Sequence, residues 1–171
     1  MKKWFENFRY YHKVHVLIIL VILAAGVYYF LTTKDNVKSD YDIAVVSSRG
    51  ISGEQLKRLQ TLLQDAGQDQ NGDNRVDAEI HVYRFAIGED GEDRSEIARL
   101  DADLIGKMSG LFFVEDPVKF EESTNGTGKA ADAVPVSGIP MLSGCGTDDL
   151  YLLVRTGADE KYAELFSALT K

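Results

Sequence analysis

The chain has 171 residues, of which 44% are hydrophobic, and its formal net charge is −8. The first 39 residues carry six basic and two acidic side chains, so residues 40–171 carry 13 basic against 25 acidic ones. This acidic balance argues against nucleic acid as a partner, because nucleic-acid binding requires basic patches. Cys145 is the only cysteine, which excludes an internal disulfide and a zinc site built on paired cysteines.

An uncharged, strongly apolar stretch occupies residues 14–33. At a rise of 1.5 Å per residue, twenty helical residues reach about 30 Å, the thickness of a bilayer core. The stretch therefore predicts a transmembrane helix that contacts the lipid bilayer. Lys and Arg side chains are in excess before it, so the N-terminus is expected in the cytoplasm and the C-terminal part outside the cell.

The alternative is a cleaved signal peptide, but no Ala-x-Ala cleavage pattern follows the apolar run. We expect an uncleaved signal-anchor in a single-pass cell-membrane protein. The predicted organisation is a cytoplasmic segment over 1–13, the span over 14–33, a linker over 34–40 and an extracytoplasmic domain over 41–171. The 131 residues of that domain are enough for one hydrophobic core.

Local patterns predict alternating strands and helices in this domain. Residues 41–46 form a short apolar run typical of a buried strand. Ser52 and Gln55 have the spacing of a capping box, four leucines follow at helical period, and Gly67 ends the helix. Residues 76–82 alternate between apolar and polar, which predicts a second strand.

The second half continues the same alternation. Ser95 is expected to cap a helix that carries five apolar side chains on one face: Ile97, Leu100, Leu104, Ile105 and Met108. Residues 111–114 are expected to form a fully apolar strand and residues 121–132 a loop. A last strand is predicted over 150–154 and a last helix after Asp159. The order predicts an α/β fold: a small doubly wound, mostly parallel sheet of about four strands with three helices.

Ligands of such sheets bind beyond the carboxyl ends of the strands. Ser47, Ser48 and Arg49 follow the first strand and precede a helix, a suitable place for an anion or a sugar hydroxyl. Asp116 follows the third strand, and Arg155 follows the last and is expected to point to the same crevice. These five residues are the candidate ligand-binding site. The alternative interpretation is that they are ordinary polar loop residues.

An acidic turn offers oxygen ligands at the spacing of a calcium loop. These are Asp69, Asn71, Asp73 and Asp77. Two departures weaken the pattern: Asn74 stands where glycine is usual, and Ile80 stands where a bidentate glutamate belongs. A solvated helix-to-strand turn is the favoured interpretation, with a weak structural calcium ion as the alternative.

No catalytic arrangement is expected. His81 is the only histidine in residues 41–171, and it lies in the middle of a predicted strand. The carboxylates occur in solvated runs, and no glycine-rich phosphate loop is present. The chain is therefore not expected to be an enzyme.

Residues 42–122 resemble the first lobe of bacterial extracellular solute-binding proteins of the periplasmic-binding-protein type. The resemblance lies in the opening strand, the leucine-rich helix and the segment 108–117, which is similar to the stretch facing the solute cleft in that family. The whole chain also resembles single-span surface proteins of Gram-positive bacteria, whose acidic Asn-Gly-Asp turn is similar to residues 69–77. The sequence departs from the solute-binding family in two respects: it shows no second lobe and no lipid-attachment cysteine.

The sequence thus favours a membrane-anchored ligand-binding or protein-interaction module, whose partner is an unknown protein or small ligand. The alternative is a structural accessory subunit of a membrane or surface complex.

Overall fold

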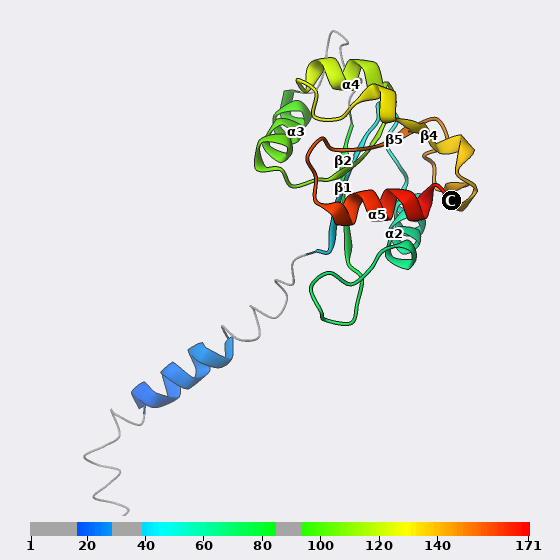
Figure 1. Ribbon diagram of the computed structural model, residues 1–171. Helices are drawn as coiled ribbons and strands as arrows, with labels where there is room; N and C mark the ends of the chain where they lie inside the picture. Colours follow the sequence, from blue (N-terminus) through cyan, green and yellow to red (C-terminus); the bar gives the residue numbers. More distant parts are fainter. Residues whose placement is uncertain (1–16, 29–38, 85–93) are drawn as a thin grey trace, which may run out of the picture. The chain divides into compact units, whose positions relative to one another are not determined.

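A computed structural model describes residues 17–28, 39–84 and 94–171 (Figure 1). The chain divides into two compact units, Met1–Lys38 and Ser39–Lys171. In the first unit, residues 17–28 are helical and exposed. The predicted segments 1–13 and 34–38 lie outside the described residues.

The prediction of a transmembrane helix over 14–33, and with it of a single-pass signal-anchor, is corrected by the structure. None of the helices in the described ranges combines the length and the apolar character needed to cross a membrane.

The second unit contains one mixed sheet of five strands in the order β2-β1-β3-β5-β4. Strand β1 pairs in parallel with both β2 and β3, whereas β5 is antiparallel to both β3 and β4. The strands are β1 (Tyr41–Val46), β2 (Ala78–Tyr83), β3 (Leu111–Val114), β4 (Val134–Pro135) and β5 (Tyr151–Val154).

Helices cover both faces of the sheet (Figure 1). On one face, Ile43 and Val45 of β1 pack in a cluster with leucines of α2 and α5. On the other, Ala44 and Val46 pack with residues of α3 and α4. The helices are α2 (Gly53–Ala66), α3 (Arg94–Gly106), α4 (Pro117–Ser123) and α5 (Glu160–Leu169), with 3₁₀ turns η1 (Ala130–Asp132), η2 (Val136–Gly138) and η3 (Pro140–Leu142).

The α/β prediction is confirmed, but the sheet is mixed and five-stranded instead of mostly parallel with about four strands. Strand β5 begins beside the carboxyl end of β3, since Val114 pairs with Tyr151. The chain between them does not cross back to the other end of the sheet, so β5 must run antiparallel. The extra strand β4 contains Pro135 and lies at the sheet edge, where a missing N–H is tolerated.

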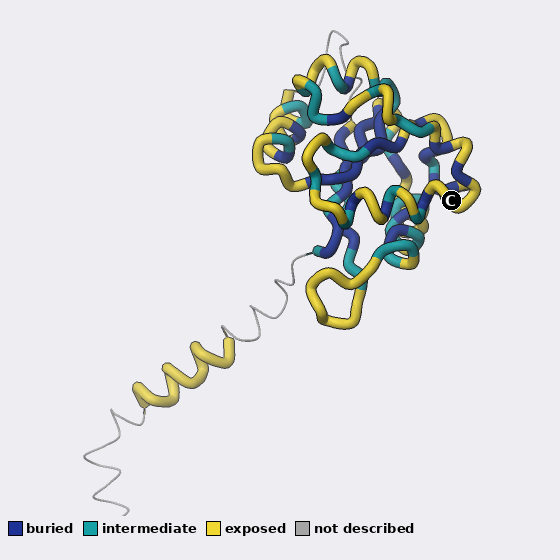
Figure 2. Tube along the Cα trace, viewed as in Figure 1, coloured by how far each residue is buried: buried dark blue, intermediate teal, exposed yellow. Residues whose placement is uncertain are grey.

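A fourth helix in this unit, α4, replaces the start of the predicted loop 121–132. Asp116 and Pro117 begin it in the manner expected of an N-cap followed by proline. Figure 2 shows the strands mostly buried and the turn after α2 exposed.

The strand order places a topological switch point between β1 and β3. The chain leaves β1 for α2 on one face of the sheet and leaves β3 for α4 on the other face. The loops after β1 and β3 therefore lead to opposite faces of the sheet, and this is the position at which open α/β sheets bind ligands.

Candidate functional site

Glu115 brings the loops after β1 and β3 together at this switch point. Its Oε1 atom accepts hydrogen bonds from the Ser47 hydroxyl, the Ser48 backbone N–H and the Ser48 hydroxyl, each at 2.8 Å. Ser47 Oγ in turn accepts from the Arg49 backbone N–H at 3.3 Å. Ser47 is buried and Ser48 exposed, so the cluster extends from the sheet to the surface.

The environment of Glu115 favours its charged form. Burial raises the pKa of Glu115, but the hydrogen bonds from Ser47 and Ser48 outweigh it and hold the pKa below its ordinary value. Both serine hydroxyls donate to a carboxylate, so this cluster presents an acceptor with negative charge. The arrangement is suited to a hydrogen-bond donor or a cation and disfavours an anion.

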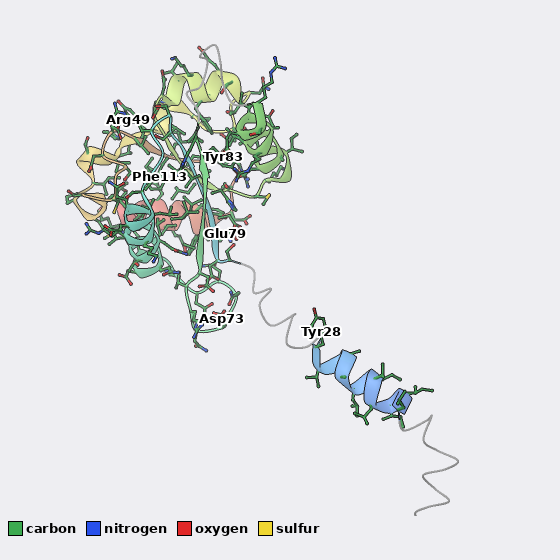
Figure 3. All side chains as sticks on the ribbon, turned by 180° about the vertical axis from the view of Figure 1, so that it is seen from behind. Tyr28, Arg49, Asp73, Glu79, Tyr83 and Phe113 are labelled. Atoms are coloured by element: carbon green, nitrogen blue, oxygen red, sulfur yellow. The ribbon has the colours of Figure 1, made fainter. Side chains whose placement is uncertain are left out.

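Arg49 extends from the same loop toward the segment that precedes β5. Its Nη1 atom donates to Asp149 Oδ2 at 2.8 Å, and the two side chains are 80% and 53% exposed. Figure 3 labels Arg49 at the end of the sheet opposite Glu79. An ion pair this exposed is weak and can exchange with a ligand.

Asp116, the next predicted site residue, is used mainly by the fold. Its Oδ1 atom accepts from the backbone N–H groups of Val118 and Lys119 at 3.1 Å each, which caps α4. Its Oδ2 atom lies 4.0 Å from Lys119 Nζ. Asp116 therefore adjoins Glu115 in the chain but serves first as a helix cap.

Arg155 lies at the other end of the sheet from these residues. Because β5 is antiparallel to β3, the residue after β5 is beside the start of β3. Arg155 Nη1 donates to the Ser109 carbonyl at 2.8 Å. The structure thus brings Ser47, Ser48 and Asp116 to one end and separates Arg155 from them.

The acidic turn after α2 is held by hydrogen bonds within the protein. Asp69 accepts from the N–H groups of Asn71, Gly72 and Asn74, and these bonds, that of Gly72 foremost, lower the pKa of Asp69. Asn74 has φ +64°, so it adopts the left-handed conformation at the position where glycine was expected.

The turn does not gather its carboxylates around one point. Among the described residues, the one group of three metal-ligating side chains with ligand atoms within 4.8 Å of one another is Asp42, Glu79 and His81. Asp69, Asp73 and Asp77 do not form such a group. The candidate calcium ligands thus lie along a turn whose conformation is held by hydrogen bonds from backbone N–H groups to side-chain oxygens.

Cys145 is buried beside an open groove of about 490 Å³ between α2 and η3. Burial raises the pKa of the Cys145 thiol, which keeps it protonated and unreactive. The groove is also lined by Lys57, Arg58 and Met141.

Two residues that contact the predicted site residues were not themselves predicted: Glu115 and Asp149. Glu115 directly follows a fully buried strand, and this position is a usable signal because the carboxyl ends of strands carry ligands. Asp149 has no comparable signal, since its position beside Arg49 depends on the antiparallel return of the chain.

The fold and this cluster together define an α/β domain with an open mixed sheet and a polar cluster at its switch point. Comparison with protein-family models, with curated proteins and with solved structures gave no match.

Proposed function

We propose that residues 39–171 form a binding module that holds a hydroxyl or protonated amine at Glu115. The observation that carries the proposal is the convergence of Ser47 and Ser48 on one ionised carboxylate at the switch point. A carboxylate accepts several hydrogen bonds, and those made to a charged group are the stronger ones. Arg49 and Asp149 supply a second, exposed donor and acceptor beside it.

The group to be bound can belong to a small solute or to a side chain of a partner protein, and two experiments separate these sources. In the first, the full chain is screened against polyols, sugars, amino acids and amines by thermal unfolding. Hits are then followed through the Ser48 amide resonance, which reports directly on the contact with Glu115. We expect a ligand to raise the unfolding temperature and to shift this resonance.

In the second experiment, immobilised full chain captures proteins from a lysate of the source cells. The test variant for both experiments is Glu115→Gln, which removes the charge but keeps the shape. Glu122→Gln is the matched control, because Glu122 is exposed on α4. Binding that is lost in Glu115→Gln and kept in Glu122→Gln supports the proposal.

A ligand or partner that binds Glu115→Gln as tightly as the unchanged chain contradicts the proposal. An absence of any binder in both experiments does so as well.

A further inference from the structure

Strand register brings two carboxylates near the amino ends of β1 and β2 together with an imidazole from the middle of β2. Asp42 is paired with Glu79, and Ala44 with His81. Side chains two residues apart on a strand share a face, so Glu79 and His81 lie on the face that Asp42 also occupies. One ligand atom from each of the three residues lies within 4.8 Å of the other two.

The imidazole of His81 has an unsatisfied atom in this cluster. His81 Nε2 is buried and has no hydrogen-bond partner, although the Glu79 Oε1 atom is 3.9 Å away. A buried polar atom without a partner is costly and therefore needs an explanation. The 3.9 Å separation is too long for a hydrogen bond, but a single ion about 2.1 Å from each atom spans it.

The charges around the cluster are also uncompensated. In the described ranges, no Lys or Arg forms an ion pair with Asp42 or Glu79. The nearby Lys161 donates to the Asp40 carbonyl and lies over the rings of Tyr41 and Tyr162. Two carboxylates and an imidazole without a protein cation are therefore available to a divalent metal ion.

Hydrogen bonds to neighbouring residues already hold Asp42, one of the three candidate ligands. Ser39 Oγ donates to Asp42 Oδ1 at 2.5 Å, and the Asp42 backbone N–H donates to the Tyr162 hydroxyl at 3.2 Å. Such contacts behind a ligand fix its direction in metal sites. Glu79 is 62% exposed and His81 19% exposed, so the cluster opens to solvent on the side of Glu79.

We infer that Asp42, Glu79 and His81 bind a divalent transition-metal ion of the zinc type. An imidazole favours Zn²⁺, Fe²⁺ or Ni²⁺ over Mg²⁺ and Ca²⁺, which prefer all-oxygen sites. Three protein ligands leave a fourth position for water or for a ligand atom of another molecule. This inference concerns the end of the sheet opposite Glu115 and does not depend on the proposed function.

The test is a zinc titration of the metal-stripped full chain by calorimetry, repeated with Co²⁺ to follow coordination by visible absorption. We expect one equivalent to bind, and Mg²⁺ and Ca²⁺ to bind far more weakly. Glu79→Gln and His81→Gln should each weaken zinc binding by more than about tenfold. Tenfold is the lower limit of the loss in affinity when only a contact behind a ligand is removed, and these variants remove the ligand itself. Glu79 is exposed, so its variant keeps the fold and its metal-free unfolding temperature.

Two controls identify where the metal sits. His12→Gln combined with His15→Gln removes the other histidines of the chain, and Asp73→Asn alters the acidic turn. Zinc binding that is unchanged in both controls and weakened in Glu79→Gln and His81→Gln supports the site. Binding that survives in Glu79→Gln and His81→Gln, or an absence of binding at millimolar zinc, overturns it.

Discussion

The two ends of the β-sheet differ in how their polar side chains are satisfied. At the carboxyl end, the hydroxyls of Ser47 and Ser48 already donate to Glu115. At the amino end, His81 Nε2 is buried without a partner beside Asp42 and Glu79. Glu115 Oε1 thus already accepts three hydrogen bonds at the carboxyl end, whereas His81 Nε2 at the other end makes none.

The ends also differ in how tightly they are packed. At the amino end, Tyr41 is buried at the start of β1 and the buried Tyr162 ring lies against Gly110 just before β3, whereas Arg49 and Asp149 at the other end are exposed. We therefore expect substitutions at the amino end to cost more stability.

The largest effect is expected from Gly110→Ala at the start of β3. A Cβ atom there would lie 2.3 Å from atoms of the Tyr162 ring, which is almost fully buried. The ring cannot move without losing its contact with the Asp42 N–H. We expect a loss of about 3 kcal/mol in the free energy of unfolding, measured by urea denaturation.

Gly53→Ala is the control for this substitution, because a Cβ atom at Gly53 has nothing within 4 Å. An equal effect of the two substitutions would show that packing against Tyr162 is not the cause.

A smaller loss is expected from Asp40→Ala, which precedes β1. Asp40 is buried, and its carboxylate accepts from the N–H groups of Gln70, Asn71 and Asp77. Removing it takes this acceptor from the Gln70 and Asp77 N–H groups, whereas the Asn71 N–H keeps its bond to Asp69, and we expect a cost of about 2 kcal/mol. Denaturation of the exposed-turn variant Asp73→Asn serves as the comparison and should show little change. Equal stability of the two variants would mean that Asp40 does not anchor the turn.

At the carboxyl end, Glu115→Gln is expected to cost about 1 kcal/mol, because one carboxylate acceptor is replaced by an amide oxygen. The pKa of Glu115 is lower in the folded protein than its ordinary value of 4.5, so its ionised form stabilises the fold above that pH. This contribution is lost as the pH falls through the lowered pKa.

Denaturation between neutral pH and pH 3 should therefore show a steeper loss of stability in the unchanged chain than in Glu115→Gln. Parallel pH profiles would contradict the assignment of Glu115 as an ionised acceptor.

The smallest effect is expected from Arg49→Ala. Its ion pair with Asp149 is exposed on both sides, so the free energy of unfolding should fall by less than about 1 kcal/mol. The loss should disappear at high salt, because exposed charges are screened. A larger loss that persists at high salt would show that Arg49 has a structural role. Substitutions at the two ends of the sheet would then differ less in their cost to stability.

Several elements followed from local sequence alone. Strand β1 covers the predicted residues 41–46, and α2 has both hydrogen bonds of the predicted Ser52–Gln55 capping box. The predicted strand 111–114 is β3, and it is buried throughout. These features depend on periodicity and on contacts a few residues apart, which a sequence displays directly.

The helix α3 shows where periodicity was insufficient. Leu100 is buried as the pattern predicts, but Ile105 is 83% exposed. The buried position is taken instead by Asp103, which accepts from the Tyr83 and Ser109 hydroxyls. A buried carboxylate is stable there because partners from β2 and from the segment before β3 satisfy it.

The sequence by itself therefore determined the α/β class, most element positions and the polar ends of β1 and β3. Tertiary structure decided the direction of β5, which separates Arg155 from Ser47, and the register that brings Asp42 beside Glu79. The physical reason is that a strand has the same two-residue alternation in either direction and beside any neighbour. Pairing and direction depend on how the connecting segments pack, and only the folded chain contains that information.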